Sequence, residues 1–203
     1  MLLHRLILVT AVFTFFLVPT GASGALVDSD GDGLTDDQEK LFGSNAADTD
    51  TDGDTYPDFD EVMYGYSPTD PAPVKKNRPM ILIDLTSQRI QYIVADVIMH
   101  EAPVSTGYWR TATPVGRFSI ERKVPVMRYT GATYDYKNVK WNLQFKPHYY
   151  LHTAYWHDDF GIKPRSRGCV NMREKDVEII YKYAPIGTPV EVIGTTPRAP
   201  VSV

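Results

Sequence analysis

One histidine and the single cysteine of this 203-residue chain are spaced so that they could form a nucleophile and its base. Cys169 lies within residues 166–171 (SRGCVN), and His152 precedes it by seventeen positions. A thiolate is a strong nucleophile and an imidazole can accept the thiol proton, a pairing suited to acyl transfer. A lone cysteine cannot form a disulfide within the chain, and Ser, Arg and Gly are unusual neighbours for a buried structural cysteine. We therefore expect Cys169 to be a nucleophile and His152 its base.

The residues around this pair resemble the active-site signature of the L,D-transpeptidases. That signature is a histidine, a variable loop, and Ser-(His/Arg)-Gly-Cys followed by an aliphatic residue and Asn or Arg. In this chain it reads HTAYWH (152–157), FG (160–161) and SRGCVN (166–171). A second feature of the family lies upstream, in VSTG (104–107) and TPVGRF (113–118). The resemblance covers residues 78–194 and implies a β-sandwich with the cysteine in a cleft.

The resemblance also implies a reaction. Cys169 attacks the carbonyl that joins the third residue of a peptidoglycan stem peptide to the fourth, D-alanine leaves, and a thioester remains. An amine of a neighbouring stem then attacks the thioester and gives a 3→3 cross-link. His152 takes the thiol proton and later deprotonates that amine. Backbone N–H groups around Gly168 and Cys169 are expected to hold the oxyanion.

The other residues of the signature receive roles from the resemblance. Arg167 cannot act as a base, so we expect it to lower the pKa of Cys169 or to grip the stem peptide. Ser166 belongs to the same catalytic motif. Thr153 is the candidate for orienting His152, through its backbone carbonyl or its hydroxyl.

Further residues are expected to shape or contact the substrate site. Trp156 is expected at the entrance of the cleft. His157 either contacts substrate or packs the loop, and Asn171 either contacts substrate or fixes the turn. The two other tryptophans, Trp109 and Trp141, are interpreted as core or cleft walls.

Other outcomes of the same chemistry remain open from sequence. Water as acceptor would make the protein an L,D-carboxypeptidase, and a protein lysine as acceptor would attach proteins to the wall. A non-catalytic, calcium-dependent wall-binding protein is a third hypothesis, which the intact Cys169 and His152 disfavour. No cofactor is expected for the chemistry itself.

Charge is divided sharply along the chain. Residues 28–70 contain 14 Asp and Glu against one basic residue, Lys40, whereas residues 71–203 have a net charge of +8. A basic exported domain suits a polyanionic partner such as a cell wall with its peptidoglycan stem peptides. No motif of nucleic-acid binding is present, so we expect no nucleic-acid partner.

The acidic segment is an internal repeat with a period of 22 residues. DSDGDGLTDDQE (28–39) aligns with DTDGDTYPDFDE (50–61), and both place carboxylates at loop positions 1, 3, 5, 9 and 12. This is an oxygen arrangement suited to Ca²⁺, and it resembles the calcium repeats of the thrombospondin type-3 class. We expect a structural Ca²⁺ in each loop and a stiff, metal-dependent spacer or wall contact. The expected ligands are Asp28, Asp30, Asp32, Asp36 and Glu39 in the first loop and Asp50, Asp52, Asp54, Asp58 and Glu61 in the second.

The N-terminus is typical of an export signal. Arg5 precedes an apolar run over residues 6–18 and a region of small residues. The run is shorter than a bilayer-spanning helix, so we expect a signal peptide over 1–24, with retention as a membrane anchor as the alternative. Either way the remainder lies outside the cytoplasm, in the cell envelope. The predicted organisation continues with the acidic repeats (25–71), a Pro-rich linker (72–78), the catalytic domain (79–194) and a tail (195–203).

Short apolar runs with turn residues between them predict a mainly β catalytic domain. Strands are expected over 80–85, 90–95, 97–99, 118–120, 124–127 and 189–193, and one helix over 174–183. The predicted fold is therefore an L,D-transpeptidase-like β-sandwich with one helix, preceded by a small calcium-loop repeat module.

Overall fold

The computed structural model describes residues 27–198, so the predicted signal peptide lies outside the described residues. In chain order the elements are α1 (Asp36–Phe42), α2 (Asp58–Tyr64), β1 (Pro79–Asp84), β2 (Arg89–Val94), β3 (Val97–Pro103), β4 (Gly116–Ser119), β5 (Arg122–Gly131), β6 (Tyr134–Lys146), β7 (Tyr149–Thr153), β8 (Val170–Met172), α3 (Glu174–Tyr183) and β9 (Pro189–Ile193). No helix among residues 27–198 is both long and apolar enough to cross a membrane.

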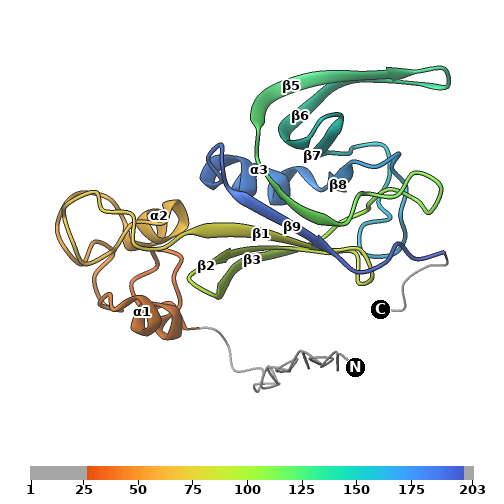
Figure 1. Ribbon diagram of the computed structural model, residues 1–203. Helices are drawn as coiled ribbons and strands as arrows, with labels where there is room; N and C mark the ends of the chain where they lie inside the picture. The colour runs from red at the N-terminus through yellow and green to blue at the C-terminus, as the bar shows by residue number, and fades with distance from the viewer. Residues whose placement is uncertain (1–26, 199–203) are drawn as a thin grey trace, which may run out of the picture.

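Two mixed sheets form the body of the protein (Figure 1). The first has the strand order β3-β2-β1-β9-β4, in which β1 and β9 are parallel. The second has the order β5-β6-β7-β8, in which β7 and β8 are parallel. Strand and helix residues from both sheets and from α3 share one hydrophobic core, for example Ile83, Leu143 and Ile180. The expected mainly β class with one helix in this part of the chain is confirmed.

Helix α3 follows β8 directly and packs against β6 and β7. Glu174 and Asp176 lie in its first turn, where negative charge interacts favourably with the helix dipole. Its buried face contains Val177, Ile180 and Tyr183, at the spacing of an amphipathic helix. The helix thereby covers the second sheet behind the strands that hold the active-site motif.

The second sheet contains strands that sequence reasoning missed. No strand was predicted at β6, which runs for 13 residues, or at β7 and β8. β5 and β6 form a long hairpin that projects at the top of the view in Figure 1. Many residues of this hairpin are exposed on both faces, so its sequence lacks the apolar alternation by which strands are usually recognised.

The acidic segment packs against the catalytic domain instead of standing apart as a spacer. Val62 and Met63 of α2 are fully buried in the common core. The Tyr92 hydroxyl lies 2.9 Å from the Met63 carbonyl and 3.1 Å from the Tyr183 carbonyl, so its proton is shared between α2 and α3. Lys182 also pairs with Asp60 at 3.0 Å. These contacts couple the two parts mechanically.

Candidate active site

The parallel pairing of β7 and β8 brings the predicted base and the predicted nucleophile to one face. His152 of β7 is the register partner of Asn171 in β8, and Cys169 stands two residues before Asn171. Because side chains alternate along a strand, Cys169 and Asn171 share a face, while Val170 and Met172 are fully buried on the other. His152, Cys169 and Asn171 line the same cavity of about 190 Å³.

The structure gathers most of the sequence-predicted site residues around this cavity. Its complete lining is Tyr129, Tyr134, Tyr136, His148, His152, Trp156, Arg165, Ser166, Arg167, Cys169 and Asn171. Thr153, His157 and Gly168 do not line it. They lie behind it, where each contacts a residue that does.

His152 is held as a neutral base. Its Nδ1 lies 2.8 Å from the Thr153 backbone carbonyl, which can only accept, so Nδ1 carries the proton and Nε2 has a free lone pair. Burial lowers the pKa of His152 to about 4, although the bond to Thr153 opposes this shift. The ring also stacks on Tyr129, with centroids 4.7 Å apart. Thr153 therefore orients the base through its carbonyl, and its buried hydroxyl oxygen has no hydrogen-bond partner.

Cys169 is held as a neutral thiol. Desolvation raises its pKa to about 11, against a backbone hydrogen bond from Tyr150 that lowers it. The expectation that Arg167 lowers this pKa is not met. The Arg167 guanidinium stacks over the Tyr134 ring, 4.5 Å from its centroid, and donates to the Thr133 hydroxyl at 3.3 Å. Arg167 thus fastens the tip of the β5–β6 hairpin to the cysteine loop.

These pKa values predict a distinctive pH dependence. Between the pKa of His152 and that of Cys169 both groups are neutral, and the thiolate fraction rises tenfold per pH unit. We expect alkylation of Cys169 in the free protein to accelerate about tenfold per unit from pH 7 to pH 10. Acylation by a substrate should be nearly constant from pH 6 to pH 9, because His152 loses its basicity only near pH 4. Stopped-flow alkylation and acylation rates across pH measure both, and an inflection near pH 6–7 in alkylation would indicate a thiolate–imidazolium pair instead.

The loop before Cys169 is fixed by Ser166. Its hydroxyl accepts from the Gly168 N–H at 3.0 Å and donates to the Cys169 carbonyl. The Gly168 N–H is therefore hydrogen-bonded to Ser166 in this structure. Gly168 has a φ of +123°, and a Cβ there would lie 2.6 Å from the Tyr149 ring. Glycine is required here by backbone conformation and by crowding.

The second sequence motif closes around the same loop. Thr113 donates from its hydroxyl to the Gly168 carbonyl at 2.9 Å and accepts from the Gly107 N–H at 3.0 Å. Ser105 forms a bridge with Asn171, and Gly107 forms one with Ser166. The two motifs, far apart in sequence, therefore build one structure beside β8.

Aromatic residues of the β5–β6 hairpin form the opposite wall of the cavity. Tyr136 stacks on Trp156 with ring centroids 3.8 Å apart, which places Trp156 at the cavity as expected. Tyr155 secures the same hairpin through a 2.9 Å bond from its hydroxyl to the Lys137 carbonyl. Sequence reasoning missed Tyr129, Tyr134 and Tyr136. The only available signal was the alternation of Tyr134 and Tyr136, which puts both on one face of a strand.

One further cavity residue and one tryptophan complete the surroundings of the site. His148 lines the cavity, and its carbonyl lies 3.8 Å from the Cys169 sulfur. Trp109, interpreted as core or cleft wall, is 51% exposed, with the guanidinium groups of Arg110 and Arg198 over its ring.

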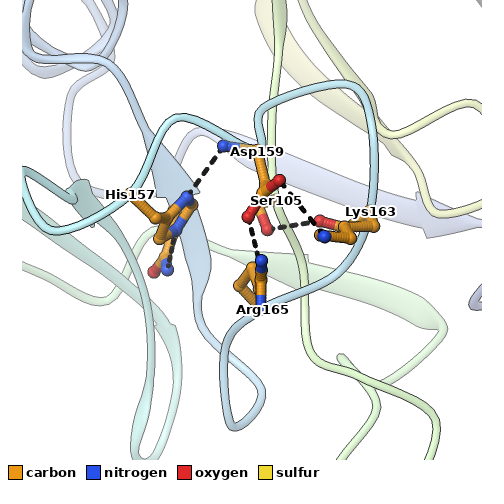
Figure 2. A network of polar contacts seen from close by, with 6 residues as sticks. Ser105, His157, Asp159, Lys163 and Arg165 are labelled. Carbon is orange, nitrogen blue, oxygen red and sulfur yellow. Dashed lines mark hydrogen bonds and ion pairs between the residues drawn. The ribbon is translucent and has the colours of Figure 1, made fainter. Parts of the chain in front are cut away.

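His157 belongs to a polar network behind the cavity (Figure 2). Its Nδ1 accepts from the Asp159 N–H at 3.2 Å, and its Nε2 lies 3.0 Å from the Asn171 side-chain amide. The Asp159 carboxylate pairs with Arg165 and Lys163, and Ser105 donates to the Lys163 carbonyl at 2.8 Å. This network holds the loop between His152 and Cys169 against β8.

The acidic repeats bring their carboxylates together in two clusters. Asp28, Asp30 and Asp32 offer oxygens within 4.8 Å of one another, and so do their counterparts in the second loop, Asp50, Asp52 and Asp54. Asp36 and Asp58, at position 9, instead accept hydrogen bonds from the backbone N–H and hydroxyl of Ser29 and Thr51 respectively.

The glutamates at position 12 are buried, each with one carboxylate oxygen unpaired. Glu39 is fully buried and Glu61 is 6% exposed, and one carboxylate oxygen of each has no hydrogen bond. Burial, together with neighbouring carboxylates such as Asp30, raises the pKa of Glu39 to about 7. The same causes, with Asp52 as the foremost neighbour, raise the pKa of Glu61 to about 8. Orphaned buried oxygens facing further carboxylates are the donor set that a hard cation requires.

Comparison with known proteins gives one family and several solved structures. The model of the YkuD family, described as an L,D-transpeptidase catalytic domain, matches residues 78–192. A structure of an L,D-transpeptidase from Mycobacterium smegmatis is 22% identical, with a TM-score of 0.54 over 58% of this chain and 59% of its own. The catalytic domain of an Enterococcus faecium L,D-transpeptidase is 22% identical, with a TM-score of 0.50 over 57% of this chain and 96% of its own. No curated protein sequence matches the chain.

At these identities the solved structures show the shared fold alone. The chain spans only about three fifths of the mycobacterial structure, whereas it spans nearly the whole of the isolated enterococcal domain. The acidic repeats lie outside the residues that the family model matches.

Proposed function

Because the chain belongs to the YkuD family of L,D-transpeptidase catalytic domains, we propose that it is a cysteine acyltransferase that forms 3→3 peptidoglycan cross-links. The observation that carries the proposal is the convergence of His152, Cys169 and Asn171 on one cavity from the paired strands β7 and β8. A nucleophile, an oriented base and a buried binding site are what acyl transfer to a peptide amine requires.

The proposed first step starts from a neutral thiol and a neutral imidazole. As the Cys169 sulfur bonds to the carbonyl carbon of the third stem residue, the thiol proton passes to Nε2 of His152. The C–N bond to D-alanine then breaks, and His152 returns the proton to the leaving nitrogen. The Thr153 carbonyl stabilises the imidazolium that forms between these events, because it already accepts from Nδ1.

The second step regenerates the enzyme. An amine of a neighbouring stem attacks the thioester carbon, His152 takes a proton from that amine, and the sulfur leaves and recovers a proton. Water in place of the amine would give carboxypeptidase activity, and a protein lysine would give protein attachment to the wall. These reactions share every residue named above and differ only in what reaches the thioester.

We further propose that each acidic loop binds one Ca²⁺. Three aspartates and a buried glutamate in each repeat would hold the ion, which would supply the positive charge that the buried oxygens of Glu39 and Glu61 lack. The role proposed for the ion is structural, because the loops belong to a segment that packs against α3 and not to the cavity with Cys169.

The proposed setting is the cell envelope, with export by the N-terminal signal. The net charge of +8 over residues 71–203 favours association with a polyanionic wall. The proposed substrates are stem peptides of peptidoglycan in that wall.

Mass spectrometry of products from a purified disaccharide-tetrapeptide tests the function. We expect the full chain to produce a dimer that lacks one D-alanine. A disaccharide-tripeptide alone would identify a carboxypeptidase, and mass added to a lysine-containing protein substrate would identify wall attachment. The absence of all three products, with a folded protein and Ca²⁺ present, would contradict the enzyme assignment.

A further inference from the structure

The hydrogen bonds of His157 determine its tautomer. Nδ1 faces the backbone N–H of Asp159 at 3.2 Å, and a backbone N–H can only donate. Nδ1 must therefore be unprotonated. Burial also lowers the pKa of His157, so that the ring is neutral near pH 7. A neutral imidazole carries one proton, which must then be on Nε2.

This tautomer in turn determines how the Asn171 amide is oriented. The structure has Asn171 Nδ2 at 3.0 Å from Nε2, and two donors cannot bond to each other. Because the protonated Nε2 needs an acceptor there, we assign the side-chain oxygen to this position, with the amide turned over. The Asn171 backbone cannot adjust, because its N–H and C=O both pair with Ser105 at 2.9 Å. Only rotation of the amide satisfies the contact. The NH₂ group is then the part of Asn171 that faces away from His157.

Asn171 is placed so that its NH₂ group can contact a bound substrate. It is 2% exposed, lines the cavity, and lies on the same strand face as Cys169 and beside His152. A donor at this point can bond to an oxygen of a bound peptide, whereas an oxygen there would repel it. One orientation of the Asn171 amide therefore attracts a substrate oxygen, and the other repels it.

We propose that His157 is a positioning residue that, by donating from Nε2 to the Asn171 side-chain oxygen, turns the Asn171 NH₂ group into the cavity to bind an oxygen of the acyl-donor peptide. This inference rests on the proposed acyltransferase function. It gives Asn171 a substrate-binding role and gives His157 an indirect one, and thus decides between the alternatives that sequence left open for both residues. His157 also packs against Phe160, with ring centroids 4.8 Å apart, so a purely structural role is the competing explanation.

A matched pair of substitutions separates the two explanations. Gln and Glu have nearly the same shape but differ in what they can donate. In the full chain at pH 8, His157→Gln keeps a donor towards Asn171, whereas His157→Glu offers only acceptors and favours the opposite amide orientation. We expect kcat/KM for the donor peptide to be about tenfold lower in His157→Glu than in His157→Gln, mostly through a higher KM. In the Glu variant the substrate oxygen loses its hydrogen bond to the Asn171 NH₂ group and meets the amide oxygen instead. In an Asn171→Ala background the difference between Gln and Glu should disappear, because the effect passes through Asn171.

A measurement that does not depend on activity accompanies the kinetics. Nitrogen-15 NMR of the His157 ring should show Nδ1 unprotonated and Nε2 protonated at pH 7. A protonated Nδ1, equal kcat/KM for the Gln and Glu variants, or a difference that persists with Asn171→Ala would each overturn the inference. A wild-type chain without turnover but with the expected ring tautomer would contradict the proposed function and leave the amide orientation supported.

Discussion

Replacing Cys169 with alanine is expected to reduce turnover of a tetrapeptide donor by at least about a thousandfold. The alanine variant has no atom that can form the thioester, and no other cysteine exists in the chain to replace it. The side chain is only partly buried, so its removal should leave the fold nearly unchanged. The measurement is the initial rate of D-alanine release, with the thermal melting temperature of both proteins as the control for folding.

His152 provides the matched comparison for this loss. His152→Gln keeps a similar shape but has no imidazole base, so it should also lose most of the turnover while the thiol remains present for alkylation. The two losses should not be additive in the double variant, because nucleophile and base act as one unit. A Cys169→Ala variant that retains turnover within tenfold of wild type would contradict the nucleophile assignment.

Removal of Ca²⁺ is expected to destabilise the whole protein and not only the repeats. At a concentration about a hundredfold above Kd, one ion contributes about 2.7 kcal/mol to the free energy of unfolding. Two sites would give about 5 kcal/mol, which corresponds to about 10–20 °C in Tm for a domain of this size. Val62 and Met63 of α2 belong to the common core, so the catalytic domain should share this shift.

Tryptophan fluorescence can show whether the shift in melting temperature reaches the catalytic domain. All three lie in the predicted catalytic domain, at positions 109, 141 and 156, so their fluorescence reports on that domain alone. Thermal melts followed by tryptophan emission should shift upwards on addition of Ca²⁺ to protein treated with chelator. The buried Glu39→Gln and Glu61→Gln variants should shift less. The exposed Asp37→Asn variant, which removes one charge at loop position 10, where no ligand is expected, should behave as wild type. Melting curves identical with chelator and with Ca²⁺ would contradict the calcium proposal.

The catalytic motif and the fold class could be predicted because they depend on local sequence. Cys169, His152 and their spacing are visible directly, and the family they suggested was confirmed over residues 78–192. Helix α3 was also predicted, because its apolar residues recur at helical spacing and Pro185 follows its end.

What could not be predicted depends on contacts between distant segments. The aromatic wall of the cavity comes from the β5–β6 hairpin, whose polar, two-sided exposure obscures its strands. The pKa of Cys169 is another example: Arg167 is close in sequence, yet it bonds to Thr133 and Tyr134, and burial of the thiol dominates. Burial and side-chain direction, which decide both cases, are properties of the folded chain.

The packing of the acidic repeats was likewise hidden. A Pro-rich stretch after them suggested a linker, yet the Asn77 N–H bonds to the Gly65 carbonyl at 3.0 Å, and Tyr92 connects α2 to α3. The spacing of the repeats does not indicate which of their faces packs against the catalytic domain. Only the positions of Val62 and Met63 in the assembled core show it.

Covalent catalysis by Cys169 is tested most directly by the intact mass of the protein after brief mixing with a tetrapeptide donor. We expect an adduct equal to the donor minus D-alanine, located on the peptide that contains Cys169 and absent from Cys169→Ala. D-Alanine release without any covalent adduct on Cys169, or an adduct that persists in the alanine variant, would contradict it.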